Sequence, residues 1–398
     1  MKQLQTMHDF YTVMNESCCA RRRIVAALLA DKEISAGDIA CMKNFLSLLR
    51  EVTDTTYRCT LGLEGAKTVA LDLTYEITEF EKDIYFLTHS EKEFFAWRYG
   101  EMACPADVEA VTAFVRDADL HAFITDRDGT VNNYCGRYAS SIQSIYNAVF
   151  LSQFIRQRVA NAVILTSAPL SNPGLVDIST MPEKTCFYAG SKGREYIGRD
   201  GIRRTFPIEE AKQKKLDELN ARLGHLVAQP AYEKYTLIGS GLQYKFGQTT
   251  IARQDISGSI PEEESRAFRE KVEKIVAAID PATQYFRIED TGKDIEVILT
   301  IADTHTTQKD FDKGDGVEFL NTACGLRLEK GMPLVCGDTA SDVPMVSTAQ
   351  KISNACKAIF VTKDTELQER VRAVTPQALF VAEPDSLVFG LYASAGNH

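Results

Sequence analysis

The stretch FITDRDGTVNN at residues 123–133 limits the possible folds of this chain more than any other segment. The apolar run 121–125 ends directly in Asp126 and Asp128, and a helix-like stretch and a second apolar run, NAVILTSAP, follow. Strands that alternate with helices indicate a parallel sheet covered by helices on both faces, so we predict an α/β fold. Ligands bind beyond the carboxyl ends of the strands in such sheets, where both aspartates and Ser167 lie.

The alternation of strands and helices stops after the second apolar run and resumes at Lys313. Between these points lie two helix-like segments, each followed by strand-like runs such as YTLIGSGLQYKFGQTTIAR, which is the pattern of an α+β insert. We therefore expect a Rossmann-like core with a parallel sheet over residues 118–184 and 301–398. The insert, residues 185–300, is expected to form a cap domain.

Residues 1–117 have the pattern of an N-terminal helical domain. The sequence SAGD at 35–38 has the form of a capping box, and the apolar residues that follow it lie on one face of a helix. A second box, SEKE, precedes an aromatic run at 94–97. Nothing in this segment suggests catalysis, so we interpret it as an accessory domain or as the contact of a homo-oligomer. A role in substrate binding is the alternative.

The amino-acid composition limits the binding partners and the cellular compartment that we expect for this protein. The 398 residues carry a formal net charge of −10, which repels nucleic-acid backbones and anionic membrane surfaces, so neither is expected as a partner. The cluster Arg21-Arg22-Arg23 is interpreted as a solvated helix face. No apolar stretch approaches the roughly 20 residues of a membrane span, and MKQLQTMHDFY lacks the apolar core of a secretion signal. The ten cysteines show no zinc-site spacing, so we expect free, buried thiols and a cytoplasmic protein.

The aspartate pair suits phosphoryl transfer. Asp126, at the tip of the strand, can act as a nucleophile and form an acyl phosphate. Asp128 is close enough to protonate the leaving alkoxide and later to deprotonate the attacking water. Carboxylates this close repel each other, so a hard cation is needed to hold both, and Gly129 permits the tight turn. On this motif alone, a surface turn is the alternative interpretation.

Other strand ends add to the same site. The sequence GDTASD places Asp338 and Asp342 after another apolar run, where they supply more oxygen ligands for a cation. The Ser167 hydroxyl could hold a phosphoryl oxygen. Lys313 would offset the charge of the phosphate and the carboxylates. We prefer it to Lys309 because a glycine follows Lys313 at the start of a helix, where backbone amides favour anions.

In this order, Asp-x-Asp-Gly-Thr, a strand-end serine, Lys-Gly and Gly-Asp-x-x-x-Asp resemble the four signatures of the haloacid-dehalogenase superfamily of phosphotransferases. The resemblance covers residues 115–390, and the insert lies where the type C2 caps of that family occur. It implies a nucleophile at Asp126, an acid and base at Asp128, phosphate contacts at Ser167 and Lys313, and Mg²⁺ ligands at Asp126, Asp338, Asp342 and the backbone carbonyl of Asp128.

The insert is similar to part of one branch of this superfamily. FYAGSKGREYIGRDG resembles the Ala-Gly-x-His-Gly-x-Glu segment of trehalose-6-phosphate phosphatases, and KDIEVILT resembles their Glu-bearing strand. By this likeness, the residues that line the cap and touch sugar hydroxyls are Lys192, Glu195, Lys245 and Glu296. Three departures stand against it: Lys192 replaces histidine, Ala168-Pro169 replaces Gly-Arg, and GDTASDVPM lacks the Gly-Asp-Asp-x-Thr-Asp-Glu form.

We therefore expect a Mg²⁺-dependent phosphomonoester hydrolase that acts through an aspartyl phosphate. Its expected substrate is a phosphorylated disaccharide or glycosyl solute, with trehalose 6-phosphate first. The runner-up is a mannosyl-, glucosyl- or mannosylglucosyl-3-phosphoglycerate, because a cap lysine suits a further carboxylate. A phosphotransferase and a catalytically silent regulatory protein are the remaining alternatives.

Overall fold

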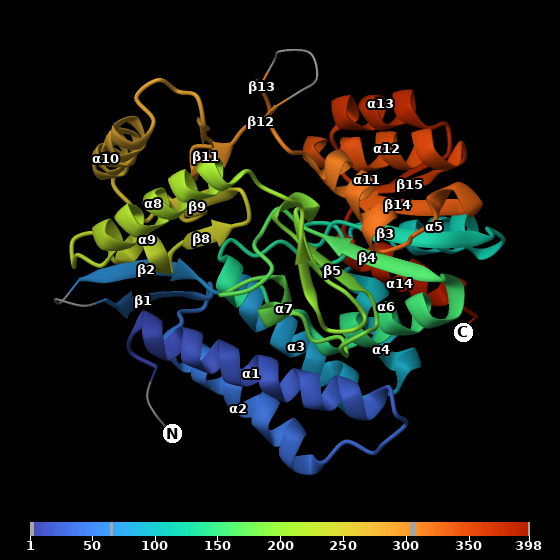
Figure 1. The fold of residues 1–398 in the computed structure, drawn as a ribbon. Helices are drawn as coiled ribbons and strands as arrows, with labels where there is room; N and C mark the ends of the chain where they lie inside the picture. Colours follow the sequence, from blue (N-terminus) through green and yellow to red (C-terminus); the bar gives the residue numbers. More distant parts are fainter. Residues whose placement is uncertain (1–3, 64–66, 303–307, 397–398) are drawn as a thin grey trace.

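The computed structural model describes residues 4–63, 67–302 and 308–396 (Figure 1). Its centre is an eight-stranded sheet in the order β16-β15-β14-β3-β4-β5-β6-β7, parallel from β16 to β5 and antiparallel from β5 to β7. The strands are β3 (Leu120–Thr125), β4 (Asn161–Leu165), β5 (Phe187–Gly190), β6 (Glu195–Ile197), β7 (Arg203–Thr205), β14 (Met332–Gly337), β15 (Lys357–Val361) and β16 (Ala378–Val381). The predicted α/β fold with a parallel sheet is confirmed.

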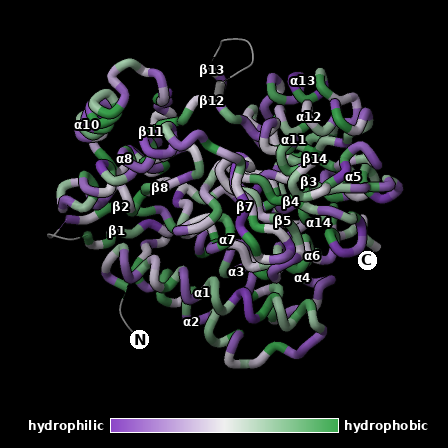
Figure 2. The backbone as a smooth tube through the Cα atoms, in the orientation of Figure 1, coloured by the Kyte–Doolittle hydropathy of each residue, from purple (hydrophilic) through white to green (hydrophobic). Residues whose placement is uncertain are grey.

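Helices cover both faces of this sheet (Figure 1). The helices are α5 (Ala106–Arg116), α6 (Ile145–Arg158) and α14 (Pro384–Ser394) on one face, and α11 (Lys313–Ala323), α12 (Val343–Ser353) and α13 (Thr365–Val374) on the other. Successive residues of a strand point to opposite faces of the sheet. The ring centroid of Phe123 therefore lies 5.3 Å from that of Phe154 on α6, whereas Ile124 belongs to the core under α11 and α12. Both faces of the inner strands β3, β4 and β14 are buried, so the sequences of these strands are largely hydrophobic (Figure 2).

The insert forms a separate antiparallel sheet with its own helices. The strand order is β10-β11-β9-β8. The elements are β8 (Leu242–Lys245), β9 (Gln248–Ala252), β10 (Phe286–Asp290), β11 (Asp294–Leu299), α8 (Glu210–Val227), α9 (Lys234–Leu237) and α10 (Glu262–Ile279). The buried positions Phe268, Val272, Val276 and Ile279 form one stripe of α10 against this sheet. The predicted α+β cap is confirmed.

The cap domain was expected to cover residues 185–300, but the first strands of this range do not belong to the cap sheet. β5, β6 and β7 belong to the central sheet, because β5 pairs in parallel with β4, with Val163 opposite Phe187, and β6 and β7 extend that pairing. A small two-stranded connection, β12 (Ile301–Ala302) and β13 (Gln308–Lys309), leads from the cap back to the core. Short elements complete the order: η2 (Tyr138–Ser140), α7 (Leu175–Ile178), η3 (Ser191–Gly193), η4 (Leu328–Lys330) and η5 (Ala340–Asp342).

The N-terminal segment is a helical bundle with one hairpin, and its helices α1 and α2 lie beneath the cap and core in Figure 1. Its elements are α1 (Met7–Leu28), α2 (Ala36–Val52), β1 (Arg58–Gly62), β2 (Thr68–Asp72), α3 (Thr74–Thr88) and α4 (Glu91–Glu101). Ser35 and Ser90 both cap their helices by accepting the backbone N–H groups of Asp38 and Glu93, but the reciprocal bond of a full capping box forms only at Ser90. The hairpin was not expected, although its alternating burial is typical of strands. The expected homo-oligomer stays a prediction.

The basic cluster at residues 21–23 is a solvated face only in part. Arg21 is 1% exposed, and its Nε donates to Asp83 Oδ2 at 2.6 Å. Arg22 donates to three backbone carbonyls within residues 176–179, which ties α1 to the core. Arg22 and Arg23 are both exposed, and Arg23 forms a 3.3 Å pair with Asp38. The prediction was wrong for Arg21, because its partner lies far away in the sequence.

The buried Arg21–Asp83 pair should dominate the stability of the bundle. Arg21→Ala leaves the Asp83 carboxylate buried without its cation, so the free energy of unfolding should fall by about 3–5 kcal/mol. Arg23→Ala breaks an exposed pair and should change it by about 0.5 kcal/mol or less. Urea denaturation of both variants is the measurement. Equal losses would contradict the importance assigned to the buried pair.

The cysteines and the helix lengths bear on two further expectations. All ten cysteines are free, as predicted, but only five of them are buried, so the expected burial was wrong for the other five. Within the described parts of the chain, every helix is too short or too polar to cross a bilayer.

Candidate active site

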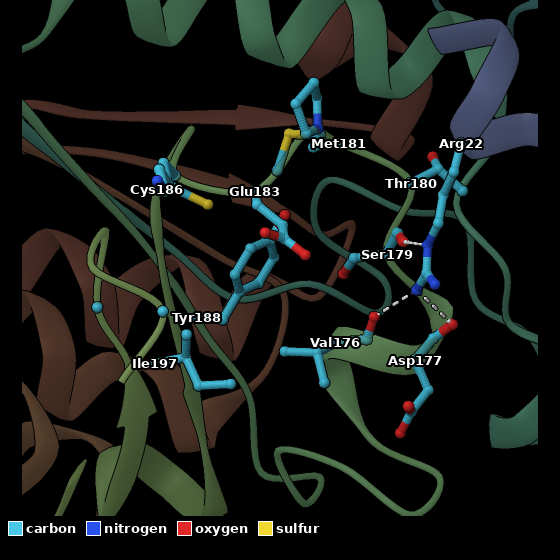
Figure 3. Close-up of a pocket in the computed structure, with 14 residues that line it drawn as sticks. Arg22, Val176, Asp177, Ser179, Thr180, Met181, Glu183, Cys186, Tyr188 and Ile197 are labelled. Carbon is cyan, nitrogen blue, oxygen red and sulfur yellow. Dashed lines mark hydrogen bonds between the residues drawn. The ribbon is translucent and has the colours of Figure 1, made fainter. Parts of the chain in front are cut away.

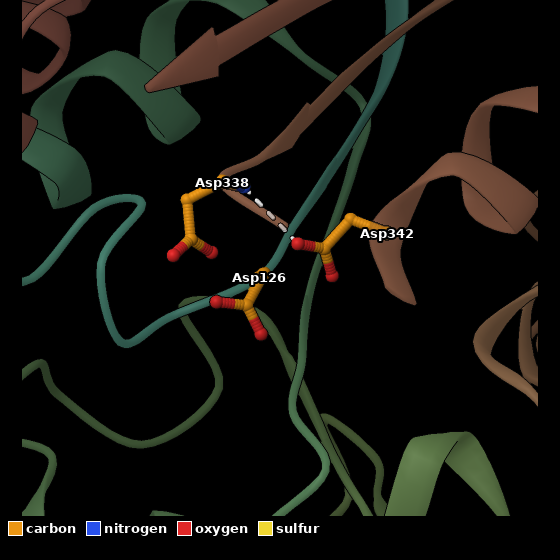
Figure 4. A group of neighbouring side chains, drawn as sticks. All are labelled: Asp126, Asp338 and Asp342. Carbon is orange, nitrogen blue, oxygen red and sulfur yellow. Dashed lines mark hydrogen bonds between the residues drawn. The ribbon is translucent and has the colours of Figure 1, made fainter. Parts of the chain in front are cut away.

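Three carboxylates meet at the carboxyl edge of the central sheet. Asp126 directly follows β3 and Asp338 directly follows the neighbouring β14, so their side chains lie side by side although they are distant in sequence. Asp342 ends η5, and its Oδ2 accepts the backbone N–H of Asp338 at 3.0 Å (Figure 4). One oxygen from each of the three lies within 4.8 Å of the others. The structure thus assembles the predicted cluster of oxygen donors.

Lys313 supplies the positive charge of this cluster. Its Nζ donates to Asp126 Oδ1 at 2.6 Å and to Asp342 Oδ1 at 2.5 Å, and the side chain is buried. Lys313 is the first residue of α11, directly after Asp312, the N-cap residue of this helix. Its rival Lys309 instead bonds Asp315 at 2.7 Å and is 44% exposed. The geometry favours Lys313 as the site lysine.

The three carboxylates carry more negative charge than one lysine balances. Burial raises the pKa of Asp126 to about 7, with repulsion from Asp342 added and Lys313 opposing. Burial, with repulsion from Asp126, raises the pKa of Asp338 to about 8. Burial also acts on Asp342, but Lys313 outweighs it and lowers that pKa. An all-oxygen set with two of its three carboxylates buried and with excess negative charge fits a hard divalent cation such as Mg²⁺.

The turn after Asp126 depends on two further residues of the motif. Thr130 donates to Asp338 Oδ1 at 3.0 Å and to Asp126 Oδ2 at 3.3 Å, so one hydroxyl links both strand ends. Gly129 has φ of +90°, and a Cβ there would lie 2.2 Å from Asp338 Oδ2. Our sequence reasoning assigned no role to Thr130, although its place in Asp-x-Asp-Gly-Thr was the available signal.

Asp128 stands apart from the carboxylate cluster. Its Oδ1 accepts the Ser141 hydroxyl at 2.7 Å and Arg127 Nη1 at 2.5 Å. Arg127 is buried and also donates to the Ser141 hydroxyl and carbonyl. Asp128 itself is partly exposed, so one side of its carboxyl group is fixed by the protein while solvent reaches the group. Such a group can exchange protons with a substrate.

Ser167 follows β4, the neighbour of β3, and is half-buried at the same sheet edge. The preceding residue, Thr166, is buried, and its hydroxyl accepts the backbone N–H of Ala168 at 3.2 Å. A contact between Ser167 and phosphate stays a prediction.

Two of the four predicted cap residues lie on the core side: Lys192 in η3, between β5 and β6, and Glu195 as the first residue of β6. Glu195 is 2% exposed and accepts the Ser191 hydroxyl at 2.6 Å and Arg203 Nη2 at 2.6 Å. Both carboxylate oxygens of Glu195 therefore already accept hydrogen bonds from other side chains of the protein. A Cβ on Gly316 would lie 2.1 Å from the Lys192 carbonyl oxygen, so this turn packs against the start of α11.

The other two predicted cap residues meet this turn from the cap. Lys245, the last residue of β8, is buried, with its Nζ 3.8 Å from Glu296 Oε1 on β11. Burial lowers the pKa of Lys245, Glu296 opposes this, and Lys192 adds to it. The backbone N–H of Phe246 donates to the Ser191 hydroxyl at 2.8 Å. The cap–core contact thus brings Lys192, Lys245 and Glu296 into one region.

A cavity of about 500 Å³ lies elsewhere, between α1 and the segment around β5 (Figure 3). Its lining includes Arg22, Glu183, Cys186 and Tyr188 and none of the clustered carboxylates.

Two family models match the chain: the trehalose-6-phosphate phosphatase C-terminal model over residues 123–387, and its N-terminal helical bundle domain over residues 6–97. The chain is 31% identical to the alpha,alpha-trehalose-phosphate synthase (UDP-forming) 2 of Caenorhabditis elegans, over 97% of this chain and 33% of the relative. It is 27% identical to the trehalose-phosphatase of Caenorhabditis elegans, over 96% of this chain and 94% of the relative.

The solved C-terminal domain of trehalose-6-phosphate phosphatase from C. albicans matches with a TM-score of 0.48 and 15% identity, over 73% of this chain and 96% of that chain. The chain spans about a third of the length of the synthases that it matches. The family models together reach from the helical bundle to the last core helix. The chain belongs to the trehalose-6-phosphate phosphatase family.

Proposed function

We propose that this chain is a Mg²⁺-dependent phosphatase that hydrolyses trehalose 6-phosphate through an aspartyl phosphate on Asp126. The observation that carries the proposal is the placement of Asp126 at the sheet edge, bonded to Lys313 and next to Asp338 and Asp342. Membership of the family supports the substrate. The free thiols agree with a cytoplasmic location.

The chain's own residues divide the reaction between them. Asp126 attacks phosphorus, and Lys313 offsets the negative charge of the phosphoryl group and the carboxylates. Asp128 gives a proton to the leaving sugar hydroxyl and then takes one from the water that hydrolyses the acyl phosphate. Asp126, Asp338 and Asp342, with the backbone carbonyl of Asp128, would hold Mg²⁺, which supplies further neutralisation of phosphate charge when bound.

The Lys245–Glu296 pair of the cap suits a neutral sugar. Glu296, which is partly exposed, balances the charge of the buried Lys245, so the pair offers one acceptor and one donor side chain to hydroxyl groups. A glycosylated phosphoglycerate would bring another negative charge close to Glu296. We therefore place trehalose 6-phosphate ahead of the glycerate esters.

Phosphate release with Mg²⁺ across a panel of phosphorylated sugars tests the proposal. The panel contains trehalose 6-phosphate, sucrose 6-phosphate, glucose 6-phosphate and glycosylated 3-phosphoglycerates. We expect the highest kcat/KM with trehalose 6-phosphate. A higher value with a glycerate ester would contradict the proposed substrate and make the runner-up correct, whereas formation of a phosphorylated acceptor in place of free phosphate would identify a transferase.

A further inference from the structure

One face of α3, in the N-terminal bundle, is bonded along its length to the catalytic loop, residues 126–144, which connects β3 to α6. The face begins with the adjacent residues Tyr75 and Glu76. Glu79 follows about one helical turn later, and Asp83 about two turns later. Asp83 holds the end of the loop, since its Oδ1 accepts the backbone N–H of Ile145 at 2.6 Å. The bundle is thus in direct contact with the segment that carries Asp126 and Asp128.

Two glutamates anchor the middle of the catalytic loop. Arg137 is 2% exposed, and its Nη2 donates to both carboxylate oxygens of Glu76, at 2.8 and 2.9 Å. Glu76 also accepts the Ser140 hydroxyl at 2.6 Å. Glu79 accepts Asn133 Nδ2 at 3.0 Å. These charge-assisted bonds hold the loop against α3 at Asn133, Arg137 and Ser140.

A chain of hydrogen bonds runs from Tyr75 to Asp128. Asn132 Nδ2 donates to the Tyr75 hydroxyl at 3.0 Å and to the Ser141 hydroxyl at 3.3 Å. The Tyr75 hydroxyl donates to the carbonyl of Ile142 at 3.3 Å, which holds the other side of the loop. The Ser141 hydroxyl then donates to Asp128 Oδ1 at 2.7 Å. Asn132 and Ser141 are both buried.

We propose that Tyr75 is a positioning residue for the reaction: through Asn132 and Ser141 it orients the carboxyl group of Asp128 for proton transfer. The inference deepens the proposed function and rests on it, because it takes Asp128 to be the acid and base. It gives the N-terminal bundle a part in catalysis, where the sequence led us to expect an accessory role. A proton donor that is misdirected by a fraction of an ångström loses efficiency even though the fold is kept.

Two substrates with different leaving groups distinguish a positioning role of Tyr75 from a general loss of folded protein. A sugar alkoxide needs a proton as it leaves, whereas p-nitrophenolate does not. Tyr75→Phe should therefore lower kcat/KM for trehalose 6-phosphate about tenfold and change kcat/KM for p-nitrophenyl phosphate about twofold or less. Loss of folded protein would lower both values equally, and that outcome would overturn the proposal.

A double-mutant cycle tests whether Tyr75 acts through Asp128. In an Asp128→Asn background, adding Tyr75→Phe should leave kcat/KM for trehalose 6-phosphate unchanged, since the group that Tyr75 orients has been removed. A further loss of the same size as in the wild type would overturn the proposal. Tyr11→Phe is the matched control, because the Tyr11 hydroxyl of α1 bonds the Leu237 carbonyl of the cap at 2.8 Å. It should leave the ratio of the two substrates unchanged.

The same assay separates the failure of this inference from the failure of the proposed function. A wild-type protein that hydrolyses another sugar phosphate of the panel instead refutes the proposed substrate, and the ratio is then measured with that sugar. A wild-type protein that hydrolyses neither a sugar phosphate nor p-nitrophenyl phosphate overturns both proposals.

Discussion

Asp126→Asn is expected to reduce phosphate release by about 10⁴-fold or more, the scale seen when a catalytic residue that works as part of a unit is removed. The amide that replaces the carboxylate cannot attack phosphorus, so the acyl phosphate does not form. The side chain keeps nearly the same volume in a buried position. Steady-state phosphate release with trehalose 6-phosphate and Mg²⁺ is the measurement.

The fold should survive this substitution. Removing one of three crowded carboxylates relieves repulsion toward Asp338 and Asp342, while Lys313 keeps its bond to Asp342. The melting temperature should therefore not fall. Asp119→Asn, at the exposed amino end of the same strand, is the matched control and should leave activity unchanged. Activity of Asp126→Asn within tenfold of the wild type would be incompatible with a nucleophilic role.

Removal of divalent metal should abolish turnover completely and reversibly. With Mg²⁺ chelated by EDTA, the clustered carboxylates Asp126, Asp338 and Asp342 share only the charge of Lys313, and the dianionic phosphate is repelled. Added Mg²⁺ should restore activity. It should also raise the melting temperature, because a ligand that binds only the folded state stabilises it.

Asp338→Asn separates a site-bound ion from a general effect of salt. This variant should lose most of the Mg²⁺-dependent rise in melting temperature, whereas Asp119→Asn should retain it. A wild-type enzyme fully active in EDTA, or an equal rise in both variants, would show that the carboxylate cluster is not the metal site.

The meeting of Asp126, Asp338 and Asp342 at one sheet edge could be predicted because it follows from local patterns and one general rule. β3 and β14 are continuous apolar runs that end in aspartates, and parallel strands bring their carboxyl ends to the same edge whatever their separation in sequence. Lys313 was preferred to Lys309 from the glycine that follows it, and the pairing with Asp126 agrees with that choice. None of these steps required a side-chain contact to be known in advance.

The contacts between the bundle and the core could not be predicted in this way. Arg21, Glu76 and Glu79 have the composition of a solvated helix surface, yet they are buried because each meets a partner brought from another part of the fold. Long-range ion pairs leave no periodic signal in the sequence. The start of the cap was misplaced for a similar reason, because only the pairing with β4 shows that β5 belongs to the central sheet.

The most direct test of the account is to locate the covalent intermediate. Asp128→Asn should still form the acyl phosphate from p-nitrophenyl phosphate, whose leaving group needs no proton, but should hydrolyse it slowly because the base is missing. After acid quenching, borohydride reduction converts an aspartyl phosphate to homoserine, which peptide mass spectrometry can locate. We predict homoserine at position 126, dependent on substrate and Mg²⁺. A burst of p-nitrophenol without homoserine at that position, or with homoserine at another aspartate, would contradict the central claim.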